Sequence, residues 1–91
     1  FQAHPFRAGI RQCDERYIDG IEIYNGKTQK ALNEKAEAWA KRSGKLVCSG
    51  SDFHTKEHTA RGGIITKVPI KSNSDLLNVL KSQDFEIIKT Y

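Results

Sequence analysis

Residues 21–49 read IEIYNGKTQKALNEKAEAWAKRSGKLVCS, and this stretch decides the fold. The β-branched and aromatic run Ile21–Tyr24 predicts a strand, and the Asn25-Gly26 pair that follows it predicts a turn. Residues 28–43 repeat apolar positions with a helical period, which predicts a helix. Leu46–Ser49 then predicts a short buried strand. The stretch therefore has the strand, helix, strand order of an α/β unit.

The helix has the strongest pattern in the chain. Its apolar positions lie on one stripe, formed by Leu32, Ala36, Trp39 and Ala40. We expect this stripe to pack on the sheet, with Trp39 as a core residue. Glu37 stands four residues before Lys41, the spacing of a stabilising ion pair, and Gly44 is the expected end of the helix.

The segments on either side extend the α/β pattern. Residues 1–3 are typical of the end of a strand, because His4 precedes a proline and is held extended, so the chain is expected to start within a fold. Residues 6–19 have no clear period and predict a loop, with or without a short helix. Further strands are expected at 62–66 and 85–88.

A second helix is predicted between those last two strands. Ser72, with Asp75 three residues later, has the spacing of a capping box, and Leu76, Leu77 and Leu80 follow it. The order strand, helix, strand, strand, helix, strand is that of an α/β protein.

The composition describes one small domain over residues 1–91. With 37% apolar residues and one Trp, the chain has enough apolar surface for a single modest core, which would bury roughly 60–65% of the surface of the unfolded chain. No apolar run approaches the ~20 residues of a membrane helix, and the first residues lack signal-peptide features. Cys13 and Cys48 have no CxxC spacing and predict reduced thiols. We therefore expect a soluble, cytoplasmic protein.

The net charge of +4 comes from 15 basic and 11 acidic residues that are scattered along the chain. Scattered charges favour a solvated helix face, and no zinc-finger, RNP or KH pattern is present. A mild basic excess does suit an anionic substrate such as a phosphate ester.

The segment Gly50-Ser51-Asp52-Phe53-His54 places a carboxylate and an imidazole two residues apart, directly after a predicted strand. In an extended chain, both side chains would project to one side, as in sites that bind a metal ion or a metal-held phosphate. The alternative is an Asp in a turn beside a surface His. His4 and Asn25 also follow predicted strands. Catalytic groups collect at the carboxyl ends of parallel strands, so we expect these residues to converge on one rim.

These segments resemble the C-terminal part of the PHP (polymerase and histidinol phosphatase) superfamily of metal-dependent phosphoesterases. The matching motifs, in order, are Ala3-His4-Pro5-Phe6-Arg7, the run from Asp19 to Gly26, Gly50-Ser51-Asp52-Phe53-His54, and Arg61-Gly62-Gly63-Ile64. The resemblance covers nearly the whole chain. It implies a partial (β/α) barrel, the C-terminal third to half of a distorted seven-stranded PHP barrel. The family's His-x-His strand and further His and Glu ligands have no counterpart here.

The resemblance also implies an activity, the hydrolysis of a phosphorylated small molecule or a nucleotide by metal-bound hydroxide. It implies that His4, Asp52 and His54 are metal ligands for two or three Zn, Mn or Fe ions, with Asp52, His54 and Arg7 as the catalytic residues. About one ligand per ion would come from this chain, so the isolated chain is expected to be inactive without the N-terminal half of the barrel. The uncovered faces of a partial barrel predict a homo-oligomer.

For several residues the sequence supports two interpretations. Arg7 and Arg61 each suit either a bidentate clamp on phosphate or a surface salt bridge. His58, four residues after His54, is either a further ligand or an exposed His. Asn25 suits the Asn-Gly turn better than contact with substrate.

Glu22 is expected to be solvated unless its strand lines a barrel. For the whole chain, the alternatives to an enzyme are a non-catalytic binding or regulatory module and a nucleic-acid-associated PHP domain.

Overall fold

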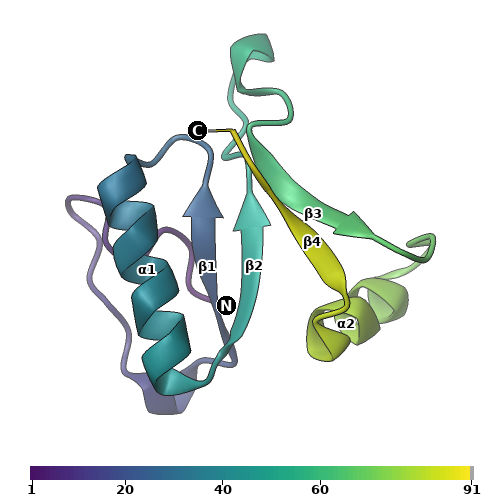
Figure 1. The fold of residues 1–91 in the computed structure, drawn as a ribbon, viewed down its shortest axis with the longest axis horizontal. Helices are drawn as coiled ribbons and strands as arrows, with labels where there is room; N and C mark the ends of the chain where they lie inside the picture. Colours follow the sequence, from purple (N-terminus) through teal and green to yellow (C-terminus); the bar gives the residue numbers. More distant parts are fainter. Residues whose placement is uncertain (91) are drawn as a thin grey trace.

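The computed structural model describes residues 1–90, which form two helices and two small sheets (Figure 1). The elements, in order, are the short 3₁₀ helix η1 (Glu15–Tyr17), β1 (Gly20–Asn25), α1 (Lys30–Ser43), β2 (Leu46–Gly50), the 3₁₀ helix η2 (Lys56–His58), β3 (Gly62–Thr66), α2 (Asn73–Ser82) and β4 (Phe85–Lys89). Both predicted helices and the strands predicted at 21–24, 46–49, 62–66 and 85–88 are present, with ends that differ by at most two residues. The strand end expected at residues 1–3 is instead a single parallel bridge at Gln2. The α/β class is confirmed.

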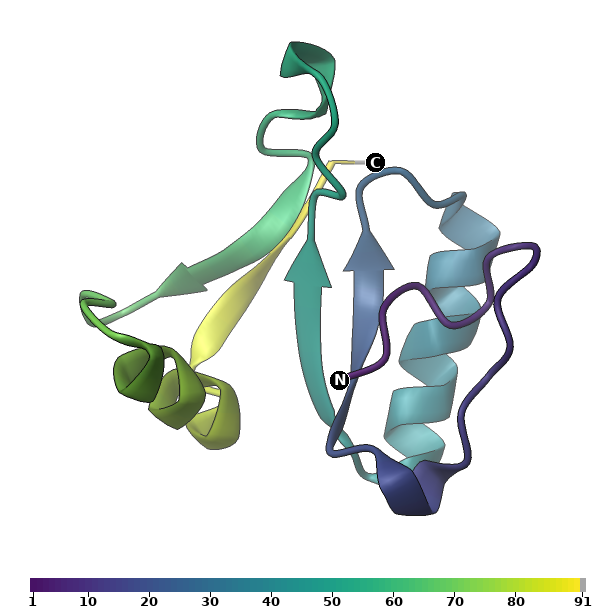
Figure 2. The same cartoon turned by 180° about the vertical axis from the view of Figure 1, so that it is seen from behind.

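The strands pair in two different ways. β1 and β2 are parallel neighbours, whereas β3 and β4 form a separate antiparallel pair. Figures 1 and 2 show the second sheet leaning away from the first, with α2 at its far end. No closed barrel forms within residues 1–90, and the predicted partial barrel is not confirmed. The strands of the second sheet are antiparallel and are connected through α2, which departs from the repeated parallel strands that a (β/α) barrel requires.

The core lies between α1 and the first sheet. It contains Ile21, Ile23, Ala36, Trp39 and Ala40. Trp39 is 1% exposed, which confirms it as a core residue, and its indole N–H donates to Glu15 Oε1 at 2.6 Å. The buried stripe of the helix also includes Asn33, a polar residue that the apolar period does not predict.

The ends of both helices have the predicted chemistry. Gly44 follows α1 in the left-handed conformation, with φ +67°. At the start of α2, Ser72 Oγ accepts from the Asp75 N–H at 3.1 Å, whereas the Asp75 carboxylate accepts from the Lys71 N–H. The capping box is therefore shifted by one residue on its carboxylate side.

Both cysteines are free. Neither helix in residues 1–90 has the length and apolar character needed to span a bilayer.

Candidate functional site

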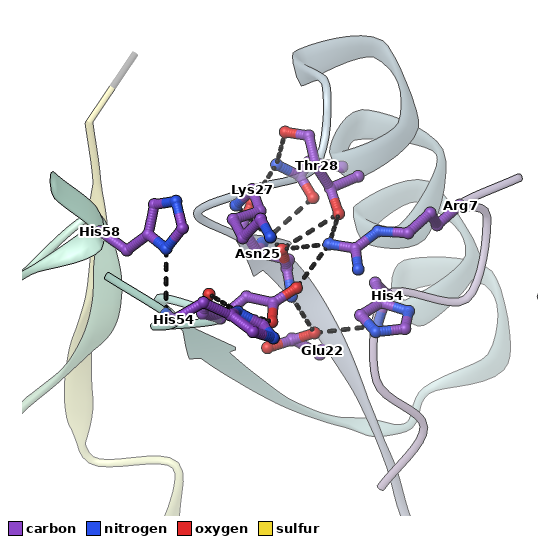
Figure 3. A network of polar contacts seen from close by, with 10 residues as sticks. His4, Arg7, Glu22, Asn25, Lys27, Thr28, His54 and His58 are labelled. Atoms are coloured by element: carbon purple, nitrogen blue, oxygen red, sulfur yellow. Dashed lines mark hydrogen bonds and ion pairs between the residues drawn. The ribbon is translucent and has the colours of Figure 1, made fainter. Parts of the chain in front are cut away.

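Three chain segments end at one edge of the first sheet. β1 and β2 run parallel, and Gln2 forms a parallel bridge to Ile21 on the other side of β1. The residues that follow these three segments meet in one polar network, drawn in Figure 3. The parallel pairing thus brings His4 and Asp52, which are 48 positions apart in sequence, to this one edge of the sheet, the rim.

Arg7 and Asp52 form the centre of this network. Arg7 Nη2 lies 2.6 Å from Asp52 Oδ2, and the same nitrogen donates to Asn25 Oδ1 at 2.8 Å and Thr28 Oγ1 at 2.9 Å. The Asp52 side chain is only 15% exposed. The Arg7 guanidinium holds the pKa of the Asp52 carboxyl below its ordinary value, against a smaller rise from burial. Asp52 is therefore a carboxylate at neutral pH.

His54 contacts Asp52 in a different geometry from the one expected. Asp52 has φ +55°, in the left-handed region, so the chain turns here and the expectation of an extended Asp-x-His pair is wrong. His54 Nδ1 lies 2.8 Å from the carbonyl oxygen of Asp52 and 3.3 Å from its Oδ1. The imidazole is 62% exposed. It closes the turn locally and leaves most of its ring open to solvent.

His4 is held by its backbone rather than by its ring. Its φ of +27° lies in the left-handed region, so the expectation that His4 is extended before Pro5 is wrong. Its N–H donates to Glu22 Oε2 at 2.8 Å. The ring atom Nδ1 is buried and has no hydrogen-bond partner within residues 1–90. A buried imidazole nitrogen without a partner is costly, so it is a natural position for a ligand.

Glu22 and Asn25 are not among the metal and catalytic residues that the resemblance implies, yet both join the network. Asn25 lies on the rim, as its place at the end of a predicted strand leads us to expect. Glu22 Oε2 also accepts from Asn25 Nδ2 at 3.1 Å, and Asn25 is 2% exposed. The expectation of a solvated Glu22 is therefore wrong, because its carboxylate has two donors on this rim. Asn25 does shape the turn, accepting from the Lys27 N–H at 3.0 Å, but it also contacts Arg7.

The loop after β2 contains the other ambiguous residues. His58 Nδ1 accepts from the N–H groups of His54 and Thr55, at 2.9 and 3.2 Å, and so caps η2. Partial desolvation lowers the pKa of His58, and the positive charges of Lys27 and Arg61 lower it further. His58 Nδ1 is therefore occupied by hydrogen bonds within the loop. Arg61 is half-buried at the start of β3, where its carbonyl accepts from Thr90 Oγ1 at 2.9 Å.

The donor types on the rim suit a divalent metal, but the ligand set is incomplete. Imidazole and carboxylate together fit Zn, Mn or Fe, and the unpartnered His4 Nδ1 offers one free position. Within residues 1–90, however, no three side chains of His, Cys, Asp or Glu lie close enough to hold one ion. The described residues therefore offer donors of the right type but not a complete set of ligands for one ion.

The fold and this rim define a small α/β protein with a candidate site at the carboxyl edge of its parallel strands. A family model described as PHP-associated matches residues 30–85, more than half of the chain. The chain therefore belongs to the PHP-associated family, consistent with the C-terminal part of a PHP-superfamily protein. The matched range includes Asp52 and His54, whereas His4, Arg7 and Glu22 precede it. No curated protein and no solved structure matches the chain significantly.

Proposed function

We propose that this chain supplies part of the active site of a metal-dependent phosphoesterase. The observation that carries the proposal is the meeting of His4, Arg7 and Asp52 at one strand edge, in a chain of the PHP-associated family. Asp52 offers a carboxylate, and His4 offers a buried imidazole nitrogen without a partner. These are the groups expected of metal ligands, placed beside a guanidinium that suits a phosphate.

In this proposal each residue has one role. His4 Nδ1, the Asp52 carboxylate and the exposed His54 ring are ligands for two or three Zn, Mn or Fe ions. When bound, such ions lower the pKa of a water molecule and stabilise the leaving oxygen. Arg7 binds and orients the phosphate of a small-molecule or nucleotide substrate. Arg7 also lines an open pocket of about 330 Å³ together with Lys27 and Thr28, and the two cationic side chains of this pocket suit an anion.

The N-terminal half of a PHP barrel is the partner that this proposal requires. A catalytic zinc ion typically has three protein ligands, and this chain supplies about one per ion. The isolated chain should therefore have no metal-dependent turnover.

The test combines residues 1–91 with an N-terminal PHP half that carries the His-x-His strand. Turnover of an aryl phosphate and bound metal are measured with added Mn or Zn. Asp52→Asn and His54→Ala should each lower turnover by at least about 100-fold and reduce the bound metal, because losing one ligand removes the ion that generates the nucleophile. Asp14→Asn is the matched control, because Asp14 also pairs with an arginine, Arg16, at 2.7 Å. Full metal content and full rate in Asp52→Asn would contradict the proposal.

A non-catalytic module is the second candidate, and the Arg7–Asp52 ion pair favours it. A carboxylate already paired with a guanidinium can be a structural element that joins two loops. In that case Asp52→Asn destabilises the fold, and the combined halves show no metal-dependent turnover in any variant.

A further inference from the structure

The rim contains one continuous chain of polar contacts whose two ends are the proposed ligands. The His4 N–H donates to Glu22 Oε2, which also accepts from Asn25 Nδ2. Asn25 Oδ1 accepts from Arg7 Nη2, and that nitrogen reaches Asp52. Figure 3 shows the side chains of Glu22, Asn25 and Arg7 in sequence across the rim. These contacts join three segments that are distant in sequence: residues 4–7, β1 and the loop after β2.

A bulge in β1 makes this series of polar contacts possible. In a regular strand, residues 22 and 25 would point to opposite faces, because their separation is odd. The register changes from Glu22↔Cys48 to Tyr24↔Ser49, so Ile23 is an extra residue on β1. One extra residue reverses the alternation that follows, which lets Asn25 face Glu22.

The charges at the two ends determine how the Asn25 amide is oriented. Its NH₂ group faces the Glu22 carboxylate, and its oxygen faces the Arg7 cation. The reversed amide would place the oxygen against a carboxylate and the NH₂ against a cation. Asn25 is also held at its backbone, where Asn33 Oδ1 accepts from its N–H and Asn33 Nδ2 donates to its carbonyl. The amide therefore transmits the position of Glu22 to Arg7.

Gly50, at the end of β2, leaves room for the Glu22 carboxylate. A Cβ at position 50 would lie 2.7 Å from Glu22 Oε1. Since Glu22 Oε2 is held by two donors, the side chain could not move away without breaking a contact. A glycine is therefore required at the first position of the Gly-Ser-Asp-Phe-His segment, because any side chain there would collide with Glu22.

We propose that Glu22 is a positioning residue of the site, which holds His4 in its left-handed conformation and, through Asn25, orients Arg7 against Asp52. This inference rests on the proposed function for its catalytic meaning, whereas the geometry is testable by itself. Glu22 contacts no substrate in this scheme. It acts through its neighbours, as the outer partners of metal ligands do.

NMR of the 91-residue chain tests the positioning role. In Glu22→Gln, the His4 amide should exchange with D₂O about tenfold faster, because a hydrogen bond to a charged acceptor becomes one to a neutral acceptor. The guanidinium signals of Arg7 should shift in the same variant. Gly50→Ala keeps the carboxylate and should move both signals in the same direction. Glu34→Gln, which neutralises an exposed carboxylate of α1, is the control.

Unchanged His4 exchange and unchanged Arg7 signals in both variants would overturn the inference. If the Glu22→Gln spectrum shows that this variant is unfolded, the His4 exchange rate and the Arg7 signals of Gly50→Ala decide the question. In the combined phosphoesterase, Glu22→Gln should weaken Mn²⁺ binding about 10–100-fold. Absence of metal-dependent turnover in the wild type would refute the proposed function, and the exchange data would still decide the role of Glu22.

Discussion

At the scale of single residues, the pKa of the Cys48 thiol depends on the neighbouring carboxylate of Glu22. Cys48 pairs with Glu22 across the β1–β2 register. The neighbouring Val47 packs on the core beside α1, so Cys48 lies on the opposite face of the sheet. Burial and the negative charge of Glu22 raise the pKa of the Cys48 thiol to about 11. Both causes disfavour the thiolate, which is the reactive form. Cys13, by contrast, is exposed.

This difference predicts two thiol reactivities. With a pKa of about 11, only about one Cys48 in a thousand is a thiolate at pH 8, so in Cys13→Ser an aromatic disulfide reagent should react slowly. The rate should rise as the pH approaches the pKa. Glu22→Gln should speed the reaction, because it removes one cause of the raised pKa. Prompt reaction of Cys13→Ser at pH 8 would show that Cys48 is not shielded as described.

At the scale of elements, Asn33 joins α1 to the turn after β1. It is 2% exposed and uses both ends of its amide, accepting from the Asn25 N–H and donating to the carbonyls of Asn25 and Thr28. The turn therefore does not depend on the Asn25-Gly26 pair alone. The Asn33 side chain of α1 completes the hydrogen bonds of the turn, and so it holds the Asn25 backbone at the rim.

Asn33→Ala should lower the free energy of unfolding by about 1–3 kcal/mol for each buried group left without a partner. Urea denaturation measures this loss. Asn78→Ala, at an exposed position of α2, is the matched control and should change stability by less than about 0.5 kcal/mol. Equal effects of the two substitutions would mean that Asn33 contributes only its helix propensity.

The elements were predictable from sequence, whereas the geometry of the rim was not. Periodicity located α1 and β1 because the apolar face of α1 and the β-branched run of β1 are local features. The bulge at Ile23 and the left-handed Asp52 depend on partners elsewhere in the chain, and no local pattern encodes them. The strand period alone therefore predicts a solvated Glu22, unless the strand lines a barrel. A carboxylate three residues before the strand-end Asn25 becomes informative only once the bulge is known.

At the scale of the whole molecule, the two sheets meet at a narrow junction. A Cβ at Gly62 would clash with the Gly50 carbonyl, and Ser49 Oγ accepts from the Gly63 N–H at 2.9 Å. At the same end, the Tyr24 hydroxyl accepts from the Thr90 N–H at 2.9 Å. The sheets diverge from this point (Figures 1 and 2). Divergence leaves apolar surface uncovered at the opposite end.

That surface includes a groove of about 520 Å³ between the first sheet and α2. Phe1, Leu46, Leu77 and Leu80 supply its apolar lining, and the charged residues Asp19, Lys45 and Lys81 also line it. Phe1 and Leu77 are about half exposed, at 47% and 50%. Large apolar side chains gathered in one open groove favour association.

We therefore predict that the 91-residue chain self-associates through this groove. Sedimentation should show an average mass that rises with concentration. Leu77→Lys should weaken association by about tenfold, because it places a charge among the apolar side chains that line the groove. Asn78→Lys adds the same charge on the neighbouring exposed position of α2 and should leave association nearly unchanged. The half-exposed Leu77 contributes little to the core, so both variants should unfold at similar urea concentrations. A wild-type chain that stays monomeric at about 1 mM, a concentration that detects even weak complexes, would contradict this prediction.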